Sequence, residues 1–177
     1  MKKWVIFIAT ILSLSSSVAR ADGLEKVVEA YNKGNYAQVL ELLRPLASLG
    51  IADAQYRLGF IYHMGKGVDQ DYQKAAKWYH LAAEQGHAVA QNNLGWMFDI
   101  GKGVAQDYQE AVRWYRLAAE QGDAVAQNNL GWMYDEGKGV VQDYQEAARW
   151  YHLAAEQGHA VAQNNLGVMH VKLGVEI

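Results

Sequence analysis

Residues 88–123 read AVAQNNLGWMFDIGKGVAQDYQEAVRWYRLAAEQGD, and residues 124–159 repeat this stretch almost unchanged. The two copies differ at six of their 36 positions. A looser copy occupies residues 52–87, and half of another occupies residues 160–177. A fixed period of this length predicts a repeat architecture, in which each unit buries its apolar face against its neighbours.

The first half of each copy is expected to form a helix. Ala90, Leu94 and Phe98 recur every four residues and therefore share one stripe of a helix. Gly95 lies beside this stripe, where glycine costs a helix roughly 1 kcal/mol relative to alanine. Its return in every copy predicts that a neighbouring helix approaches closely there. The following Gly-Lys-Gly-Val segment is a turn that ends the helix.

The second half of each copy is expected to form another helix. Asp107 is a good N-cap, and Glu110 three residues later predicts a capping box. Gly122 marks its C-terminal end. One broad sector of this helix carries Tyr108, Ala111, Trp114, Tyr115, Ala118 and Ala119. The unit is thus helix–turn–helix, and the fold class is an all-α solenoid of stacked pairs.

Three consecutive copies carry A-x-A-Q-x-x-L-G-x-x-Y, then G-x-G-V, then D-Y-x-x-A-x-x-W-Y-x-x-A-A-x-x-G, with Phe98 at the tyrosine position of the middle copy. This pattern resembles the Sel1-like repeat, a relative of the tetratricopeptide repeat. The resemblance covers about residues 52–169. It implies a right-handed α-superhelix whose concave side binds other proteins or peptides.

Residues 1–21 have the order of a secretory signal peptide. Lys2 and Lys3 precede a mostly apolar run over residues 4–14, and an Ala-x-Ala site ends at Ala21. The alternative is a membrane anchor, but a spanning helix needs about 20 apolar residues. We expect cleavage after Ala21 and a periplasmic or secreted protein that begins at Asp22.

The two ends of the repeat array depart from the pattern. Residues 22–51 predict a divergent first helix pair, in which Pro45 should kink or split the second helix. Residues 160–177 contain only the first helix of a repeat. This end is expected to be either truncated or covered by a partner, and a degenerate gene product is a further alternative.

Composition limits the partners. Without the three cations of residues 1–21, the formal net charge falls from −3 to −6, which disfavours nucleic acid and anionic lipid. We expect a neutral or basic protein or peptide, and no membrane association of the mature chain. The sequence contains no cysteine, so stability must come from stacking rather than from disulfides.

The nucleophile inventory argues against catalysis. Ser48 is the only serine after residue 21, where threonine and cysteine are absent, and no Ser-x-x-Lys motif is present there. Some cysteine-rich relatives of the Sel1-like family are linked to β-lactam binding, so a cell-envelope hydrolase of the β-lactam or peptidoglycan type remains the alternative. We expect a protein that is not an enzyme and that needs no cofactor.

Two further patterns have simpler interpretations. His80, Glu84 and His87 have metal-ligand spacing, but these positions point away from the apolar sector, which favours a solvated face and no metal. The segment Gly65-Lys66-Gly67 resembles a phosphate loop, yet no strand precedes it and no Ser or Thr follows the lysine. It is interpreted as the inter-helix turn.

A candidate binding groove emerges from the first helix of each repeat. Large apolar side chains lie opposite the apolar stripe and are flanked by amides and carboxylates, a combination that suits a peptide partner. The alternative is that the tryptophans pack on the next repeat or on the turn. A second exposed face carries Leu81, Leu117 and Leu153. The predicted groove residues are Phe60, Asn92, Trp96, Asp99, Asn128, Trp132 and Asp135.

Overall fold

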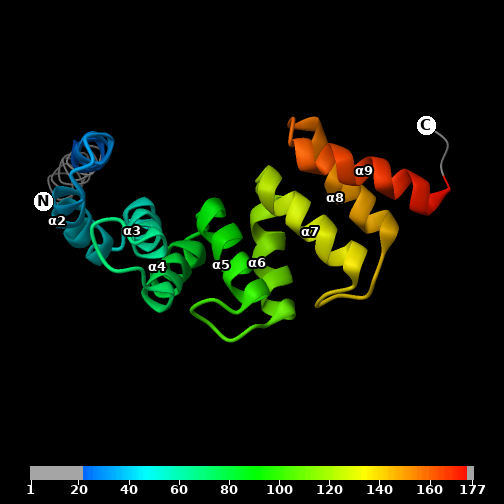
Figure 1. The fold of residues 1–177 in the computed structure, drawn as a ribbon, viewed down its shortest axis with the longest axis horizontal. Helices are drawn as coiled ribbons and strands as arrows, with labels where there is room; N and C mark the ends of the chain where they lie inside the picture. The colour runs from blue at the N-terminus through cyan, green and yellow to red at the C-terminus, as the bar shows by residue number, and fades with distance from the viewer. Residues whose placement is uncertain (1–21, 175–177) are drawn as a thin grey trace, which may run out of the picture.

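The computed structural model describes residues 22–174 and shows a stack of paired helices (Figure 1). A helical segment over residues 22–32 is followed by eight helices, and no strand occurs in this part of the chain. They are α2 (Tyr36–Ser48), α3 (Ala52–Met64), α4 (Tyr72–Glu84), α5 (Ala88–Ile100), α6 (Tyr108–Glu120), α7 (Ala124–Glu136), α8 (Tyr144–Glu156) and α9 (Ala160–Leu173). The prediction of an all-α solenoid is confirmed.

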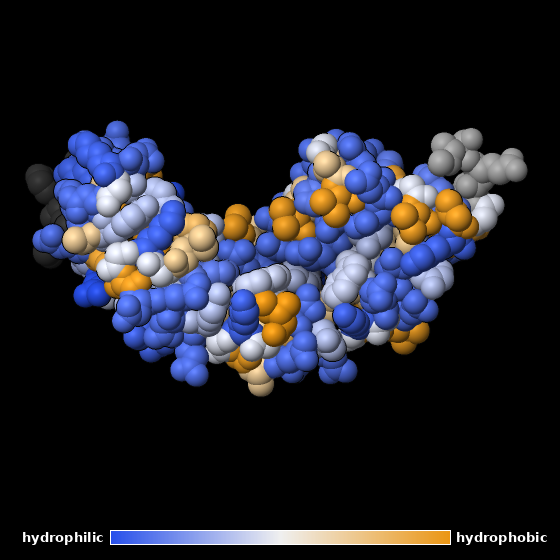
Figure 2. Space-filling view, viewed as in Figure 1, coloured by the Kyte–Doolittle hydropathy of each residue, from blue (hydrophilic) through white to orange (hydrophobic). Residues whose placement is uncertain are grey.

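Each helix packs chiefly on the helices directly before and after it in the chain. The pairs α3–α4, α5–α6 and α7–α8 form the three full repeats, and α9 packs on α8. The stack bends, so that its two ends stand on either side of a hollow (Figure 2). The buried apolar residues therefore form a row of small cores rather than one centre.

The core stripe of the first helices differs from the prediction by one residue. Ala90 and Leu94 are buried as expected, but the third member is Met97, whereas Phe98 is only half-buried. At 100° per residue, position 97 returns close to the angle of position 90, and position 98 turns well past it. The four-residue spacing had placed the stripe slightly off its true axis.

The second helices begin as predicted at their aspartate caps. Asp107 Oδ1 accepts hydrogen bonds from the backbone N–H groups of Gln109 (2.9 Å) and Glu110 (3.1 Å). The reciprocal half of the capping box is absent, because the Asp107 N–H donates to the Phe98 carbonyl (3.0 Å) instead. Glu110 pairs with Arg113 at 3.1 Å. Asp107 thus links the end of one helix to the start of the next.

The structure differs from the predictions at both ends of the described chain. Pro45 lies inside α2 without splitting it, since the helix continues to Ser48. Glu41, whose carbonyl loses its helical donor at Pro45, is exposed, so water can serve that oxygen. At the other end, Leu173 replaces a turn glycine, so α9 runs one residue further than α7 does and has Gly174 as its C-cap.

The signal-peptide prediction falls on residues 1–21, outside the described residues. Within residues 22–174, none of the helices combines the length and apolar character needed to cross a bilayer.

Candidate functional site

All seven predicted groove residues lie on α3, α5 and α7, the first helices of the three repeats. Asn92, Trp96 and Asp99 are separated by four and three residues, so they share one face of α5. Their counterparts on α7 are placed in the same way, because the repeats are nearly identical. Phe60 occupies the tryptophan position on α3.

The two tryptophans are half-buried and make packing contacts as well as presenting a surface. The Trp96 ring stacks on His63 of the preceding repeat, with centroids 5.2 Å apart and an angle of 14° between the planes. On the turn side, Lys138 Nζ lies 4.1 Å from the centroid of the Trp132 ring. The alternative of packing on the next repeat or on the turn is therefore met in part: the turn lysine contacts the Trp132 ring, whereas the ring that stacks on Trp96 comes from the preceding repeat.

The asparagines form a ladder between successive first helices. Asn129 Nδ2 donates to Asn92 Oδ1 at 3.0 Å, and Asn165 Nδ2 donates to Asn128 Oδ1 at 3.1 Å. Asn92 itself is buried, whereas Asn128 is half-buried. The ladder uses the side-chain oxygens of Asn92 and Asn128 and leaves their amide N–H groups out of it.

The two aspartates have different environments. Asp99 is half-buried, and burial raises the pKa of its carboxyl group, against the opposing effects of Lys138 and the Tyr115 hydroxyl. Asp135 is buried and accepts a hydrogen bond from Lys172 Nζ at 2.5 Å. The charge of Asp135 is thus balanced by Lys172 of α9, whereas burial makes the carboxyl group of Asp99 easier to protonate than a free aspartate.

The lysine in the middle of each inter-helix turn is a site feature that the sequence analysis missed. Lys102 Nζ lies 4.9 Å from the Tyr72 ring centroid and 5.7 Å from that of Trp96, which belong to successive repeats. Lys138 bridges Tyr108 and Trp132 in the same way. The pattern that could have revealed this lysine is Gly-Lys-Gly-Val, which recurs every 36 residues and was interpreted only as a turn.

The second glycine of each turn permits this approach. Gly103 has a φ of +75°, and a β-carbon there would collide with the carbonyl group of Tyr72. The turn therefore rests on the N-terminus of α4, the second helix of the preceding repeat. The Gly-Lys-Gly segments are therefore turns between two helices, as the sequence predicted.

The histidines and glutamates with metal-ligand spacing do not come together as a metal site in the described residues. His80–Glu84 and His152–Glu156 are exposed pairs with N–O distances of 3.7 and 3.6 Å. His87 is directed elsewhere, since its Nδ1 accepts the Ala90 N–H as the N-cap of α5. No group of three or more potential metal ligands occurs within residues 22–174.

The fold and its repeating first-helix face define a helical-repeat protein. The Sel1 repeat family profile matches residues 52–87, 88–123, 124–159 and 160–173, so this chain belongs to the Sel1 repeat family. The predicted resemblance is confirmed. Proteins of this family typically mediate protein–protein interaction, and they are often periplasmic or secreted bacterial proteins.

Solved structures agree with this assignment. A Sel1 repeat protein from Oxalobacter formigenes is 36% identical with a TM-score of 0.79, covering 86% of this chain and 63% of its own. The protective antigen c5321 of uropathogenic Escherichia coli is 46% identical with a TM-score of 0.75, covering 76% of this chain and 29% of its own. This chain thus spans less than two thirds of either relative.

A third structure shares the fold alone. Cysteine-rich protein B of Helicobacter pylori is 22% identical with a TM-score of 0.59, covering 75% of this chain and 95% of its own. Among functionally curated proteins no match was found.

Proposed function

We propose that this protein is an exported, non-catalytic binding module that holds a protein or peptide on the concave side of its stack, along the first helices. The observation that carries the proposal is a row of exposed valines on these helices. Val89, Val125 and Val161 are 40%, 46% and 55% exposed, at equivalent positions of α5, α7 and α9. An uncovered apolar row at repeat spacing suits an extended partner.

The valine row continues into the predicted groove. Val89, Asn92 and Trp96 are three and four residues apart, so they follow one side of α5. The valines and the tryptophan edges supply apolar area, and the side-chain N–H groups of the half-buried Asn128 can donate to the partner's backbone carbonyls. Affinity then comes from many similar contacts repeated along the chain.

We propose that the partner is neutral or basic. The net charge of −6 beyond residue 21 is the main support, since a charge of this sign attracts cations over long range. Asp99 adds to it locally, whereas Asp135 is balanced by Lys172. Raising the salt concentration should therefore slow association with the partner more than it speeds dissociation.

Site-directed photocrosslinking tests the location of the binding face. A photoreactive residue is placed at Val125 and, as a matched control, at Val141, which is 89% exposed on a turn. The proposal expects a crosslinked polypeptide from the cell envelope at Val125 and not at Val141. Equal products at both positions, or products only at Val141, would refute this face.

Export is tested separately, by sequencing the N-terminus of the protein recovered outside the cytoplasm. Cleavage after Ala21 gives Asp22 as the first residue. A soluble cytoplasmic protein that keeps Met1 contradicts the proposal.

A further inference from the structure

The first helix of each full repeat uses one side, its pairing face, to hold the second helix of the same repeat. In α5 the pairing face contains Gln91, Leu94 and Gly95, all of which are buried. The Tyr115 ring of α6 lies against Gly95. At the end of α6, Gln121 Nε2 donates to Gln91 Oε1 at 2.6 Å. The same two contacts join α3 to α4 and α7 to α8.

The pairing face of α9 consists of Gln163, Leu166 and Gly167, and the described chain leaves it uncovered. Gln163 is exposed and Leu166 is half-buried, whereas their counterparts on α3, α5 and α7 are buried. Among residues 22–174, nothing lies within 4 Å of a β-carbon added at Gly167. Gln163 Nε2 donates to the Ala155 carbonyl, but no donor in this part of the chain reaches its Oε1.

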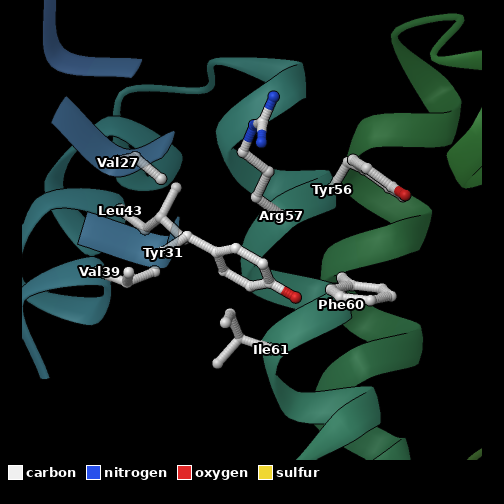
Figure 3. A pocket seen from close by; sticks show the side chains of 8 residues that line it. All are labelled: Val27, Tyr31, Val39, Leu43, Tyr56, Arg57, Phe60 and Ile61. Atoms are coloured by element: carbon white, nitrogen blue, oxygen red, sulfur yellow. The ribbon is translucent and has the colours of Figure 1, made fainter. Parts of the chain in front are cut away.

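The opposite end of the stack is covered. The 22–32 helix and α2 pack on α3 through a cluster that includes Val27 and Leu43. They leave a cavity of about 220 Å³ beside Phe60, toward which the Tyr31 ring points (Figure 3). The end of a solenoid needs such a cover, because an uncapped repeat exposes apolar surface to water. Within residues 22–174, α9 has none.

One position makes the pairing face of α9 more apolar than the other three. The hydroxyl group of each second-helix tyrosine meets a polar residue of the first helix. Tyr79 Oη lies 3.4 Å from His63 Nδ1, and the Tyr115 hydroxyl interacts with Asp99. Two repeat periods after Asp99 stands Val171, which is 79% exposed. A tyrosine hydroxyl would lack its polar partner there, so the face favours phenylalanine.

We propose that the pairing face of α9 binds an amphipathic helix of a partner polypeptide. This helix carries a phenylalanine that lies against Gly167 and, six residues later, an amide side chain that donates to Gln163, the spacing that separates Tyr115 from Gln121. Three faces with the same glutamine, leucine and glycine each hold such a helix in this molecule. Leu166 already packs partly on the α8–α9 core, so the bound helix would extend an existing core.

A second copy of this chain fits the face less well. Its helices α4, α6 and α8 each lie between two first helices, and α2 packs on the 22–32 helix and α3, so none of them is free to bind. The proposal is also independent of the proposed function. Val161 of the valine row and Gly167 lie about 120° apart around α9, on different sides of the helix.

A synthetic helix tests the ligand class with the purified protein. The probe is a peptide of residues 143–158 with Tyr151→Phe, kept helical by a lactam that joins His152→Lys to Glu156, both exposed positions of α8. We expect saturable binding in a fluorescence polarisation assay. The unsubstituted Tyr151 peptide should bind about fivefold more weakly and a Tyr151→Ala peptide at least about tenfold more weakly. No binding at millimolar concentration, or any ranking that does not place phenylalanine first, would overturn the proposal.

Variants of α9 test the location. Gly167→Leu puts a side chain where the ring would lie, and it should abolish peptide binding without disturbing the fold, because that space is open. The milder Gly167→Ala should weaken binding about fivefold. Val168→Leu, one position further on and about 100° around the helix, is the matched control and should bind as the wild type does. Wild-type affinity in a folded Gly167→Leu variant would exclude this face.

Sedimentation equilibrium distinguishes a partner helix from a second copy of this chain. We expect no self-association that Gly167→Leu abolishes. A dimer that this variant dissociates would assign the pairing face of α9 to a second copy and overturn the proposal.

Discussion

The ring of Tyr115 rests on the backbone of Gly95, where an added β-carbon would lie 2.8 Å from its Cδ1 atom. The same contact joins Gly59 to Tyr79 and Gly131 to Tyr151. These glycines let the two helices of a repeat approach closely, as their recurrence predicts. Gly167 is different: within the described residues nothing lies within 4 Å of its added β-carbon, because no second helix packs on α9 there.

Gly95→Ala should therefore destabilise the protein, whereas Gly167→Ala should not. The clash with Tyr115 is expected to cost about 1–3 kcal/mol by overpacking, partly offset by alanine's helix propensity of roughly 1 kcal/mol. Gly167→Ala gains the propensity without the clash. Urea unfolding followed by circular dichroism measures both. An equal shift of the midpoint in the two variants would show that the Tyr115 contact has no energetic role.

Stability should be spread over the stack. Leu94→Ala and Leu130→Ala remove equivalent, fully buried side chains from different repeats, and each should cost about 2–5 kcal/mol. Because they belong to separate clusters, the double variant should lose nearly the sum of the two. A single variant that leaves the urea midpoint unmoved would contradict the assigned core.

Alkaline pH should weaken the fold through its buried tyrosines. Burial raises the pKa of Tyr115 far above the value of about 10 that tyrosine has in an unfolded chain. The unfolded state then releases protons that the folded state retains, so stability is intact below pH ~10 and falls as pH rises above it. Tyr115→Phe should reduce the slope of this fall in urea titrations between pH 8 and 11. An unchanged slope would exclude Tyr115 as a source.

The turn lysines should make a modest contribution to the free energy of unfolding. Replacing Lys138 by Gln removes a cation from the ring faces of Trp132 and Tyr108 and should cost about 0.5–1 kcal/mol, whereas Lys138→Arg should restore most of it. Lys77→Gln, at an exposed position of α4, is the matched control. If both glutamine variants have the same urea midpoint, the lysine–ring contacts are without net effect.

The sequence predicts the local structure well, because its signals are periodic. The stripe containing Leu94, the cap at Asp107 and the family motif all return every 36 residues, and stacking follows from the repetition. Contacts between repeats are harder to predict from the sequence. Lys102 contacts the ring of Tyr72, 30 residues earlier, and Asp135 pairs with Lys172 only when the repeats are stacked. The cavity beside Phe60 depends on the divergent first pair, whose packing no repeat pattern describes.

The central claim is that the partner lies along the first helices, and a double variant tests it most directly. Val89→Lys with Val125→Lys changes two exposed side chains of the valine row, so the circular dichroism spectrum and the urea midpoint should stay close to those of the wild type. The affinity for the polypeptide that crosslinks at Val125 should fall at least tenfold, because charged side chains replace apolar contacts and repel a basic partner. The control Val141→Lys should bind as the wild type does. A folded double variant with wild-type affinity would contradict the claim.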